Sequence, residues 1–254
     1  MESNNSFVFS SHLPLRNLRS THHVVDGYNR GMRVLLFDID GTLISTGGAG
    51  GAALREAFRN AFNVVEAADV PFAGRTDRGI GSNLFREHQI EDSETNWTKL
   101  RNGYLERLPF HLADRDGRVL DGVATLLEEL SKLSQVAVGL LTGNTDRGAR
   151  IKLSHYELNE HFAFGGFGDE HRHRNDVAKA ALQEAEQYLN GNGKLEHVWV
   201  IGDTPLDVAC ARAIDAKVIA VSTGGHTAEE LSDAKPDVLL QSLADTERVL
   251  ELLS

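Results

Sequence analysis

One short stretch decides the fold of this chain: Arg33-Val34-Leu35-Leu36-Phe37-Asp38-Ile39-Asp40-Gly41-Thr42-Leu43. A short, unbroken apolar run ends abruptly in two carboxylates, which a glycine and a threonine follow. Such a run has the length of a strand that is buried on both faces, as in a parallel sheet. Ligands of open α/β sheets bind beyond the carboxyl ends of the strands, and Gly41 indicates that the chain turns there. We therefore interpret Asp38 and Asp40 as catalytic residues rather than as packing residues.

The composition is that of an ordinary globular protein and excludes some partners. The 254 residues are 41% hydrophobic and 25% charged, and 26 basic against 37 acidic residues give a net charge of −11. This balance argues against binding to nucleic acid or to an anionic membrane, although a local cation can still hold a small anionic substrate. The single cysteine, Cys210, rules out an internal disulfide and fits a reducing, cytoplasmic compartment; we interpret it as a small buried residue. No stretch approaches the length of a transmembrane helix, and the sequence leaves the oligomeric state open.

The chain divides into a tail, a core and an insert. Residues 1–31 are polar and rich in Ser, Asn and His, so we predict a disordered N-terminal tail. Residues 47–113 contain no convincing strand; an amphipathic helical face and two further helical stretches predict an inserted helical cap domain. Residues 32–46 and 114–254 are assigned to one α/β core domain, because a regular alternation of strands and helices resumes after the insert.

The core is predicted to be a doubly wound, parallel, Rossmann-like sheet. After the opening strand, apolar runs predict the further strands Val136–Leu141, Phe162–Phe164, Val198–Ile201, Val218–Val221 and Val238–Leu240. Right-handed crossovers place the carboxyl ends of all these strands along one edge of the sheet. Polar residues at three of these ends, the Asp38/Asp40 pair, Thr142 and Asp203, are therefore expected to converge in one crevice.

Three motifs, each closing an apolar run, carry a resemblance to a known family. They are Asp38-Ile39-Asp40-Gly41-Thr42, Leu140-Leu141-Thr142-Gly143-Asn144 and Gly202-Asp203-Thr204-Pro205-Leu206-Asp207. In this order they resemble the first, second and fourth motifs of the haloacid dehalogenase superfamily, specifically its phosphoglycolate-phosphatase-like branch with a helical cap inserted after the first strand. The resemblance covers the chain from about Arg33 to its end.

The resemblance implies two distinct roles for the paired acids. Asp38 would attack the substrate phosphorus and form an aspartyl-phosphate, which divides one hard displacement into two easier steps. Asp40 would protonate the leaving oxygen and later deprotonate the water that hydrolyses the intermediate. Two carboxylates beside a phosphate need a cation, and Mg²⁺ suits such oxygen ligands. The resemblance assigns Mg²⁺ to Asp38, to the backbone carbonyl of Asp40 and to Asp203, with Asp207 as a supporting carboxylate.

The resemblance also implies a phosphate-binding loop and a neutralising cation. Thr142, with the amides of Gly143 and Asn144, would bind the phosphoryl oxygens. The family places a lysine near the start of the helix after the third strand, but this chain has no lysine there before Lys179. Arg174 is our choice for this cation, because a guanidinium can bridge two phosphoryl oxygens; Arg172 and Lys179 remain alternatives.

A segment of the insert, Gly74-Arg75-Thr76-Asp77, resembles the part of the cap that such enzymes lower over the active site. Arg75 would then meet a carboxylate or a second phosphate of the substrate. The alternative is a simple loop turn, in which Thr76 or Asp77 caps the following helix.

These observations predict a phosphoric monoester hydrolase. We expect a Mg²⁺-dependent phosphatase that acts on a small phosphorylated metabolite, a phosphoglycolate-like phosphomonoester, through an aspartyl-phosphate. A sugar phosphomutase of the same superfamily keeps both acids and is the main alternative. A phospho-receiver signalling domain also has acids, a threonine and a cation around its phosphorylated aspartate, but it is about half this length and lacks the insert.

Overall fold

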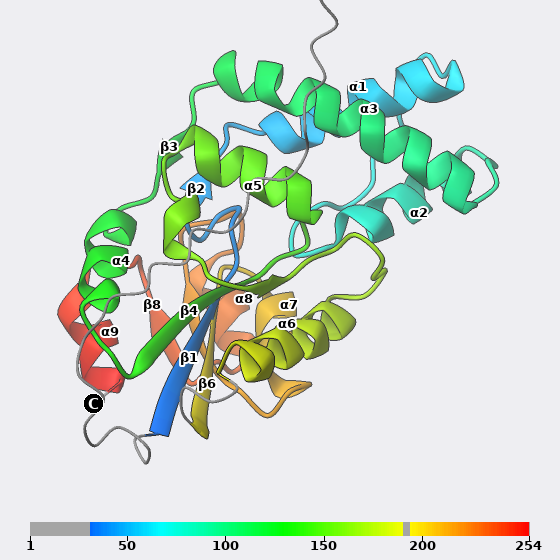
Figure 1. Cartoon of the computed structure of the whole chain (residues 1–254). Helices are drawn as coiled ribbons and strands as arrows, with labels where there is room; N and C mark the ends of the chain where they lie inside the picture. The colour runs from blue at the N-terminus through cyan, green and yellow to red at the C-terminus, as the bar shows by residue number, and fades with distance from the viewer. Residues whose placement is uncertain (1–30, 190–193, 254) are drawn as a thin grey trace, which may run out of the picture.

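A six-stranded parallel sheet forms the centre of the protein (Figure 1). The computed structural model describes residues 31–189 and 194–253. The strand order is β5-β4-β1-β6-β7-β8, and the strands are β1 (Gly31–Phe37), β4 (Val136–Leu141), β5 (Gly165–Gly166), β6 (Lys194–Gly202), β7 (Lys217–Val221) and β8 (Val238–Leu240). The strand before the paired acids therefore lies in the middle of the sheet, between β4 and β6. The predicted doubly wound parallel fold is confirmed.

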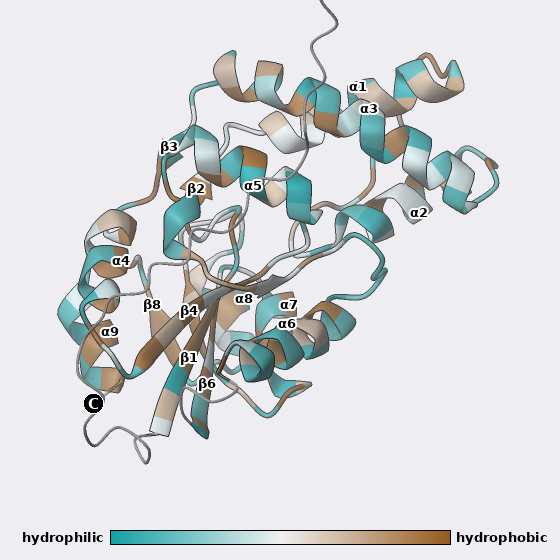
Figure 2. Cartoon of the chain, viewed as in Figure 1, coloured by the Kyte–Doolittle hydropathy of each residue, from teal (hydrophilic) through white to brown (hydrophobic). Residues whose placement is uncertain are grey.

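Helices cover both faces of this sheet, because alternate residues of its buried strands point to opposite sides. Leu35 and Phe37 of β1 pack in the cluster that contains residues of α4 (Val123–Ser131), α5 (Asp146–His155) and α9 (Thr246–Leu252). Val34 and Leu36 pack against α6 (Arg174–Leu189) and α7 (Pro205–Arg212) on the other face. Figure 2 accordingly shows hydrophobic strands between helices that are hydrophilic on their outer sides. Each of these fully buried side chains stabilises the fold by about 1.5–3 kcal/mol.

Three helices above the carboxyl edge of the sheet form a separate layer with its own hydrophobic cluster (Figure 1). They are α1 (Ala49–Phe62), α2 (Asp77–Glu87) and α3 (Glu94–Ala113). The largest buried side chains of this cluster are aromatic: Phe58, Phe85, Trp97 and Tyr104. A two-stranded antiparallel ribbon, β2 (Ile44–Ser45) with β3 (Arg118–Val119), joins the layer to the core and was not expected from the sequence. Among the described helices, none is both long and apolar enough to cross a bilayer.

The third strand, β5, begins three residues later than the sequence predicted, at Gly165–Gly166 and not at Phe162. The predicted segment still runs beside β4, because the Ala163 amide donates to the Val138 carbonyl at 3.3 Å and the Leu140 amide donates to the Phe164 carbonyl at 3.0 Å. Its two aromatic side chains pack onto the sheet: Phe162 meets Phe37 edge to face at 6.2 Å, and Phe164 fills the space left by Gly139. A short 3₁₀ turn, Asn159–His161, precedes this segment, and the small helix α8 (Ala228–Asp233) connects β7 to β8. The predicted tail lies outside the described residues, except that its last residue, Gly31, begins β1.

Candidate active site

The three polar strand ends meet in one place, as predicted. Asp38, Thr142 and Asp203 each follow the last residue of β1, β4 or β6, and these three strands are neighbours in the sheet. A cavity of 590 Å³ lies between this edge and the three-helix layer, and Asp38, Asp40 and Asp203 line it. Its size suits a small metabolite rather than a macromolecule.

A tight turn separates the two paired acids. The Leu43 amide donates to the Ile39 carbonyl at 2.9 Å, and the Gly41 amide donates to Ile44 at 2.8 Å, which closes the chain directly after the strand. Gly41 has φ +83°, a left-handed conformation that favours glycine. Because the chain turns here, Asp38 stays in the buried sheet edge while the carboxylate of Asp40 leaves it.

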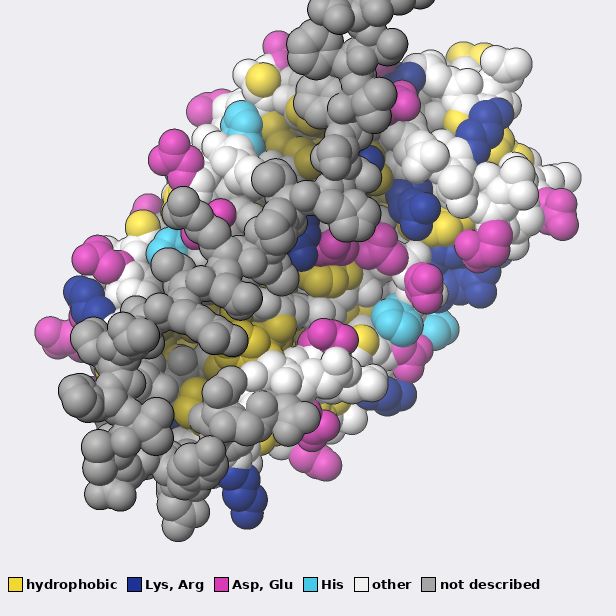
Figure 3. All heavy atoms as spheres, viewed as in Figure 1, with side chains coloured by type: hydrophobic (Ala, Val, Ile, Leu, Met, Phe, Trp, Pro, Cys, Tyr) yellow, Lys and Arg dark blue, Asp and Glu magenta, His cyan; other side chains and the backbone are white. Residues whose placement is uncertain are grey.

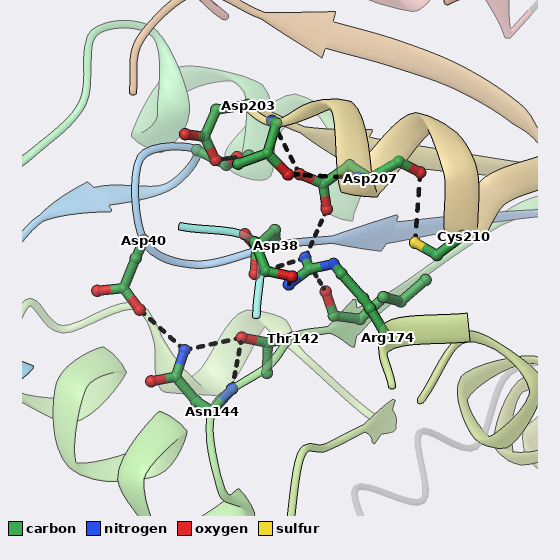
Figure 4. A network of polar contacts seen from close by, with 12 residues as sticks. Asp38, Asp40, Thr142, Asn144, Arg174, Asp203, Asp207 and Cys210 are labelled. Atoms are coloured by element: carbon green, nitrogen blue, oxygen red, sulfur yellow. Dashed lines mark hydrogen bonds and ion pairs between the residues drawn. The ribbon is translucent and has the colours of Figure 1, made fainter. Parts of the chain in front are cut away.

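Arg174 pairs with the predicted nucleophile from the first turn of α6. Its Nη2 lies 3.0 Å from Asp38 Oδ1 and donates to Asp207 Oδ1 at 2.5 Å (Figure 4). The same guanidinium donates to the Leu141 carbonyl at 3.3 Å, so it is anchored to the end of β4. Its buried Nε has no hydrogen-bond partner, which leaves one donor unused. Of the three cations considered from the sequence, Arg174 is the one that the structure brings to Asp38.

The two alternative cations lie elsewhere. Arg172 is exposed and donates to Ser82 Oγ and Asp92 Oδ2, each at 3.0 Å. Lys179 is exposed on α6 and pairs with Asp176 at 3.0 Å. Neither Arg172 nor Lys179 contacts Asp38 or Asp40, because both side chains are paired with other residues at the surface.

Asp203 completes a cluster of acids that fits a divalent cation. Carboxylate oxygens of Asp38, Asp203 and Asp207 all lie within 4.8 Å of one another in buried surroundings. Thr42 Oγ1 donates to Asp203 at 3.3 Å, and Gly224 leaves room for its carboxylate, since a Cβ there would lie 1.6 Å from Oδ2. Three buried carboxylates face one guanidinium, an excess of negative charge that a hard cation with oxygen ligands would balance.

The three carboxylates of this buried group are not equivalent as ligands. Asp207 is already engaged: its Oδ2 accepts from the Thr204 amide at 2.9 Å and from Thr204 Oγ1 at 2.7 Å, in a capping box that starts α7. Its Oδ1 accepts from Arg174. Asp38 and Asp203 therefore have oxygens free for a divalent cation, whereas Asp207 holds Arg174 in place.

Burial and crowding change the proton affinity of these acids. Burial raises the pKa of Asp203 to about 8, and repulsion from Asp207 and Asp38 acts in the same direction. Burial also raises the pKa of Asp38 to about 6, against the opposing effect of Arg174. Burial raises the pKa of the Cys210 thiol to about 12, so Cys210 is a packing residue and not a nucleophile. A divalent cation bound beside Asp38 and Asp203 would oppose both carboxylate shifts, because a nearby positive charge favours the ionised form.

Asp40 has different partners, one of which the sequence did not predict. Its Oδ2 accepts hydrogen bonds from Asn144 Nδ2 at 2.8 Å and from Lys152 Nζ at 2.6 Å. Lys152 lies on α5 with a side chain that is only 4% exposed. One signal was present in the sequence: Lys152 follows Ala149 by three residues and precedes Tyr156 by four, which places it on the apolar face of that helix.

The predicted phosphate-binding loop contacts the three-helix layer. Gly143 and Asn144 are among the residues that line the cavity, but Thr142 is not, because it is fully buried. Thr142 Oγ1 accepts from Asn144 Nδ2 at 2.8 Å. The Gly143 carbonyl accepts from the Asp77 amide at 2.7 Å. Arg75 is exposed at the cavity wall, in position to meet a ligand.

The Gly74-Arg75-Thr76-Asp77 segment also caps a helix, as the alternative interpretation predicted. Thr76 is the N-cap of α2, and its Oγ1 accepts from the Gly79 amide at 2.9 Å. Asp77 was missed as a buried acid: its Oδ2 accepts from the Thr145 amide at 2.9 Å, and burial raises its pKa to about 6, although Lys152 opposes the rise. A carboxylate from α2 therefore docks directly on the first residues of α5.

This arrangement defines an α/β enzyme with its active site at the carboxyl edge of the sheet, beneath an inserted helical cap. The sequence model of one family, described as haloacid dehalogenase-like hydrolase, matches residues 35–221. The chain belongs to this family, and the predicted superfamily is confirmed.

Three relatives illustrate the similarity. A phosphoglycolate phosphatase of Photorhabdus laumondii is 23% identical over 227 residues, which are 85% of this chain and 91% of that protein. A variant of CbbY from Rhodobacter sphaeroides, solved with xylulose-(1,5)bisphosphate, has a TM-score of 0.66 at 20% identity. The superposition covers 84% of this chain and 96% of that protein. A putative beta-phosphoglucomutase from Thermotoga maritima has a TM-score of 0.55 at 20% identity and is covered completely by 88% of this chain. The likeness to the two solved structures concerns the fold alone.

Proposed function

We propose that this hydrolase is a Mg²⁺-dependent phosphatase that cleaves a small phosphorylated metabolite through an aspartyl-phosphate on Asp38. One observation carries the proposal: the two acids after β1 have separate environments, Asp38 beside Arg174 and the acidic cluster, and Asp40 beside Lys152 at the cavity. A nucleophile needs a neighbouring cation that offsets the phosphoryl charge, whereas a general acid needs access to the leaving group. The phosphoglycolate phosphatase relative supports the same reaction class.

Each residue has a role that its contacts support. Asp38 attacks the phosphorus while Arg174 holds its carboxylate and stabilises the charge on the phosphoryl oxygens. Asp40 gives a proton to the leaving oxygen and then takes one from the water that hydrolyses the aspartyl-phosphate. Gly143 and Asn144 bind phosphoryl oxygens at the cavity wall, and Arg75 meets a second anionic group of the substrate. Mg²⁺, held by Asp38, Asp203 and the Asp40 carbonyl, would supply charge neutralisation and orientation of the phosphoryl group.

The proposed substrate is a small anion such as phosphoglycolate, and the proposed compartment is the cytoplasm. A net charge of −11 disfavours nucleic acid and anionic membranes as partners. On the face in Figure 3, acidic and basic side chains are interspersed and do not form an extended basic stripe over the described residues. The receiver alternative is set aside because the chain belongs to a hydrolase family.

The decisive experiment compares the wild-type protein with Asp38→Asn. Hydrolysis of p-nitrophenyl phosphate and of a panel of metabolite phosphates is measured with Mg²⁺ and with EDTA. We expect metal-dependent release of phosphate and a loss of about 10⁴-fold or more in kcat for the variant, since its amide is no nucleophile. Turnover in EDTA, or full activity of the variant, would contradict the mechanism.

The same assay separates the phosphatase from the phosphomutase, which the likeness to the putative beta-phosphoglucomutase keeps open. A mutase produces an isomerised sugar phosphate that depends on added sugar bisphosphate, and it releases little free phosphate. A phosphatase releases phosphate in proportion to substrate consumed.

A further inference from the structure

We propose that Lys152 is a positioning residue that orients the acid/base carboxylate Asp40, a role that rests on the proposed phosphatase function. Lys152 does not line up with any of the three sequence motifs, because it lies ten residues after Thr142 on α5. Its effect on the reaction would pass through Asp40 and not through contact with the phosphoryl group.

Two side chains, Lys152 and Asn144, hold one oxygen of the Asp40 carboxylate, and we call this pair of donors the clamp. Lys152 Nζ donates to Asp40 Oδ2 at 2.6 Å and to Asn144 Oδ1 at 2.7 Å. Asn144 Nδ2 donates to the same Asp40 Oδ2 at 2.8 Å and also to Thr142 Oγ1 at 2.8 Å, the arm of the clamp that Figure 4 draws. Both donors reach Oδ2, and among the described residues no hydrogen bond reaches Oδ1. The arrangement therefore fixes the carboxylate and leaves Oδ1 as the oxygen that carries the proton.

The clamp is built into the fold rather than formed by a surface side chain. Lys152 is 4% exposed, and α5 is held at its start by Thr145, whose Oγ1 accepts from the Gly148 amide at 3.2 Å. Gly50 makes room for the ammonium group, since a Cβ there would lie 3.1 Å from Nζ. A buried lysine needs a charged or polar partner, and the partner here is a residue of the cavity wall.

Other ionisable groups also face the ammonium group. Besides Asp40, they are Asp77 of α2, Tyr104 of α3 and Tyr156 at the end of α5. Removal of the Lys152 charge therefore also changes the surroundings of these groups and the stability of the fold. The distinguishing test must therefore report on proton transfer by Asp40 and not on overall stability.

Leaving groups of different basicity give that report. An alkoxide needs a proton from a general acid as the ester bond breaks, whereas p-nitrophenolate leaves with little help. The ratio kcat/KM covers the steps up to cleavage of the ester bond and so isolates the acid role of Asp40 from its later role as a base. Loss of the clamp should harm alkyl phosphates selectively.

The test uses Lys152→Met, which removes the charge and keeps the approximate chain length. The control is Lys132→Met, at an exposed lysine that ends α4 and pairs with Glu128. With Mg²⁺ present, we expect Lys152→Met to lower kcat/KM for alkyl phosphates by about 10–100-fold, in line with losses for orienting residues, and for p-nitrophenyl phosphate by about threefold or less. Lys132→Met should match the wild type on both. Equal losses on both substrates, or no loss on either, would overturn the positioning role.

A double-mutant cycle and a rescue experiment keep the result independent of folding. In an Asp40→Asn background, adding Lys152→Met should lower kcat/KM for alkyl phosphates by less than about a further twofold, because the effects of residues that act as a unit are not additive. A further loss of tenfold would mean that Lys152 acts elsewhere. Because position 152 is buried, Lys152→Cys is alkylated with 2-bromoethylamine in urea, in a chain that also carries Cys210→Ala so that one thiol reacts, and is then refolded. This rebuilds an ammonium group of lysine length and, once mass spectrometry shows complete labelling, it should restore alkyl-phosphate turnover relative to the unlabelled protein. Failure of this restoration would also count against the proposal.

The two proposals fail in different ways. If the wild-type protein releases no phosphate, or Asp38→Asn stays active, the proposed function is wrong. Suppose instead that the wild type releases phosphate and that Asp40→Asn is impaired. If Lys152→Met then keeps the wild-type preference between alkyl and p-nitrophenyl phosphates, only the role of Lys152 is wrong.

Discussion

The active site has two sides with different charge balance, although their acids, Asp38 and Asp40, are only two residues apart in the chain. The buried side is the cluster around Asp38, and the open side is Asp40 with its partners Asn144 and Lys152. On the buried side, one guanidinium pairs with Asp38 and Asp207, Asp203 adds a third carboxylate, and the Asp38 side chain is 6% exposed. On the open side, Asp40 accepts from the Lys152 ammonium group and from the Asn144 side-chain amide, and its side chain is 42% exposed. The buried side keeps an excess of negative charge for a cation and a phosphoryl group, whereas the open side is already balanced.

The difference comes from which elements build each side. Strands β1 and β6 and helix α7 supply the buried acids, so their carboxylates are crowded by the sheet itself. Helix α5 and the loop before it supply the partners of Asp40, and α2 reaches the same loop through Asp77. The proposed nucleophile thus lies at the end of a central strand, and the proposed acid/base residue lies where the cap meets the core.

The largest expected effect concerns the cation of the buried side. Arg174→Met leaves three buried carboxylates without a positive charge, so we expect the free energy of unfolding in EDTA to fall by about 3 kcal/mol. Phosphatase activity should fall strongly at the same time. Urea denaturation monitored by circular dichroism measures the stability. Arg172→Met, which removes an exposed guanidinium two residues earlier, should change the stability by less than about 1 kcal/mol and leave activity intact; the reverse order would contradict the assignment of Arg174.

A smaller effect separates the metal ligands from the acid/base. Saturating Mg²⁺, at about 100 times its Kd, should raise the free energy of unfolding of the wild type by about 2.7 kcal/mol, because it binds the folded state alone. Asp203→Asn removes a proposed ligand and should lose this gain, whereas Asp40→Asn should keep it, since Asp40 contributes only its backbone carbonyl. Thermal unfolding with Mg²⁺ and with EDTA measures both. Equal gains in the two variants would move the metal away from the buried side.

The sequence predicted the buried side far better than the open side, for a physical reason. Asp38 and Asp203 each end an apolar strand, and parallel strands bring such ends together whatever the details of packing. Arg174 was selected through the family resemblance, which places a cation near the start of this helix, and Arg172 and Lys179 remained as alternatives. Lys152 and Asp77 lie on helices, and their partners are 112 and 68 residues away in the chain, so no local pattern joins them. The start of the third strand was predicted three residues too early, because apolar residues continue from the packed segment Phe162–Phe164 toward β5 and leave no local signal for the boundary.

The smallest effect tests the acid that α2 brings to the open side. The folded-state pKa of Asp77 is raised from 3.8 to about 6, first by burial, with Lys152 opposing. The folded state then binds more protons than the unfolded state between these values, so the contribution of Asp77 to stability is full at low pH and is lost as the pH rises through 6. Asp77→Asn removes this loss while its amide oxygen can still accept from the Thr145 amide.

The stability of Asp77→Asn relative to the wild type should therefore increase by about 1 kcal/mol between pH 5 and pH 7, measured by urea denaturation in EDTA. Asp69→Asn, whose side chain is fully exposed, should show no such trend. A difference that stays constant with pH would mean that Asp77 is ionised at all these pH values, and that Lys152 and the Thr145 amide together compensate its burial. The open side would then be more strongly balanced than the comparison with the buried side implies.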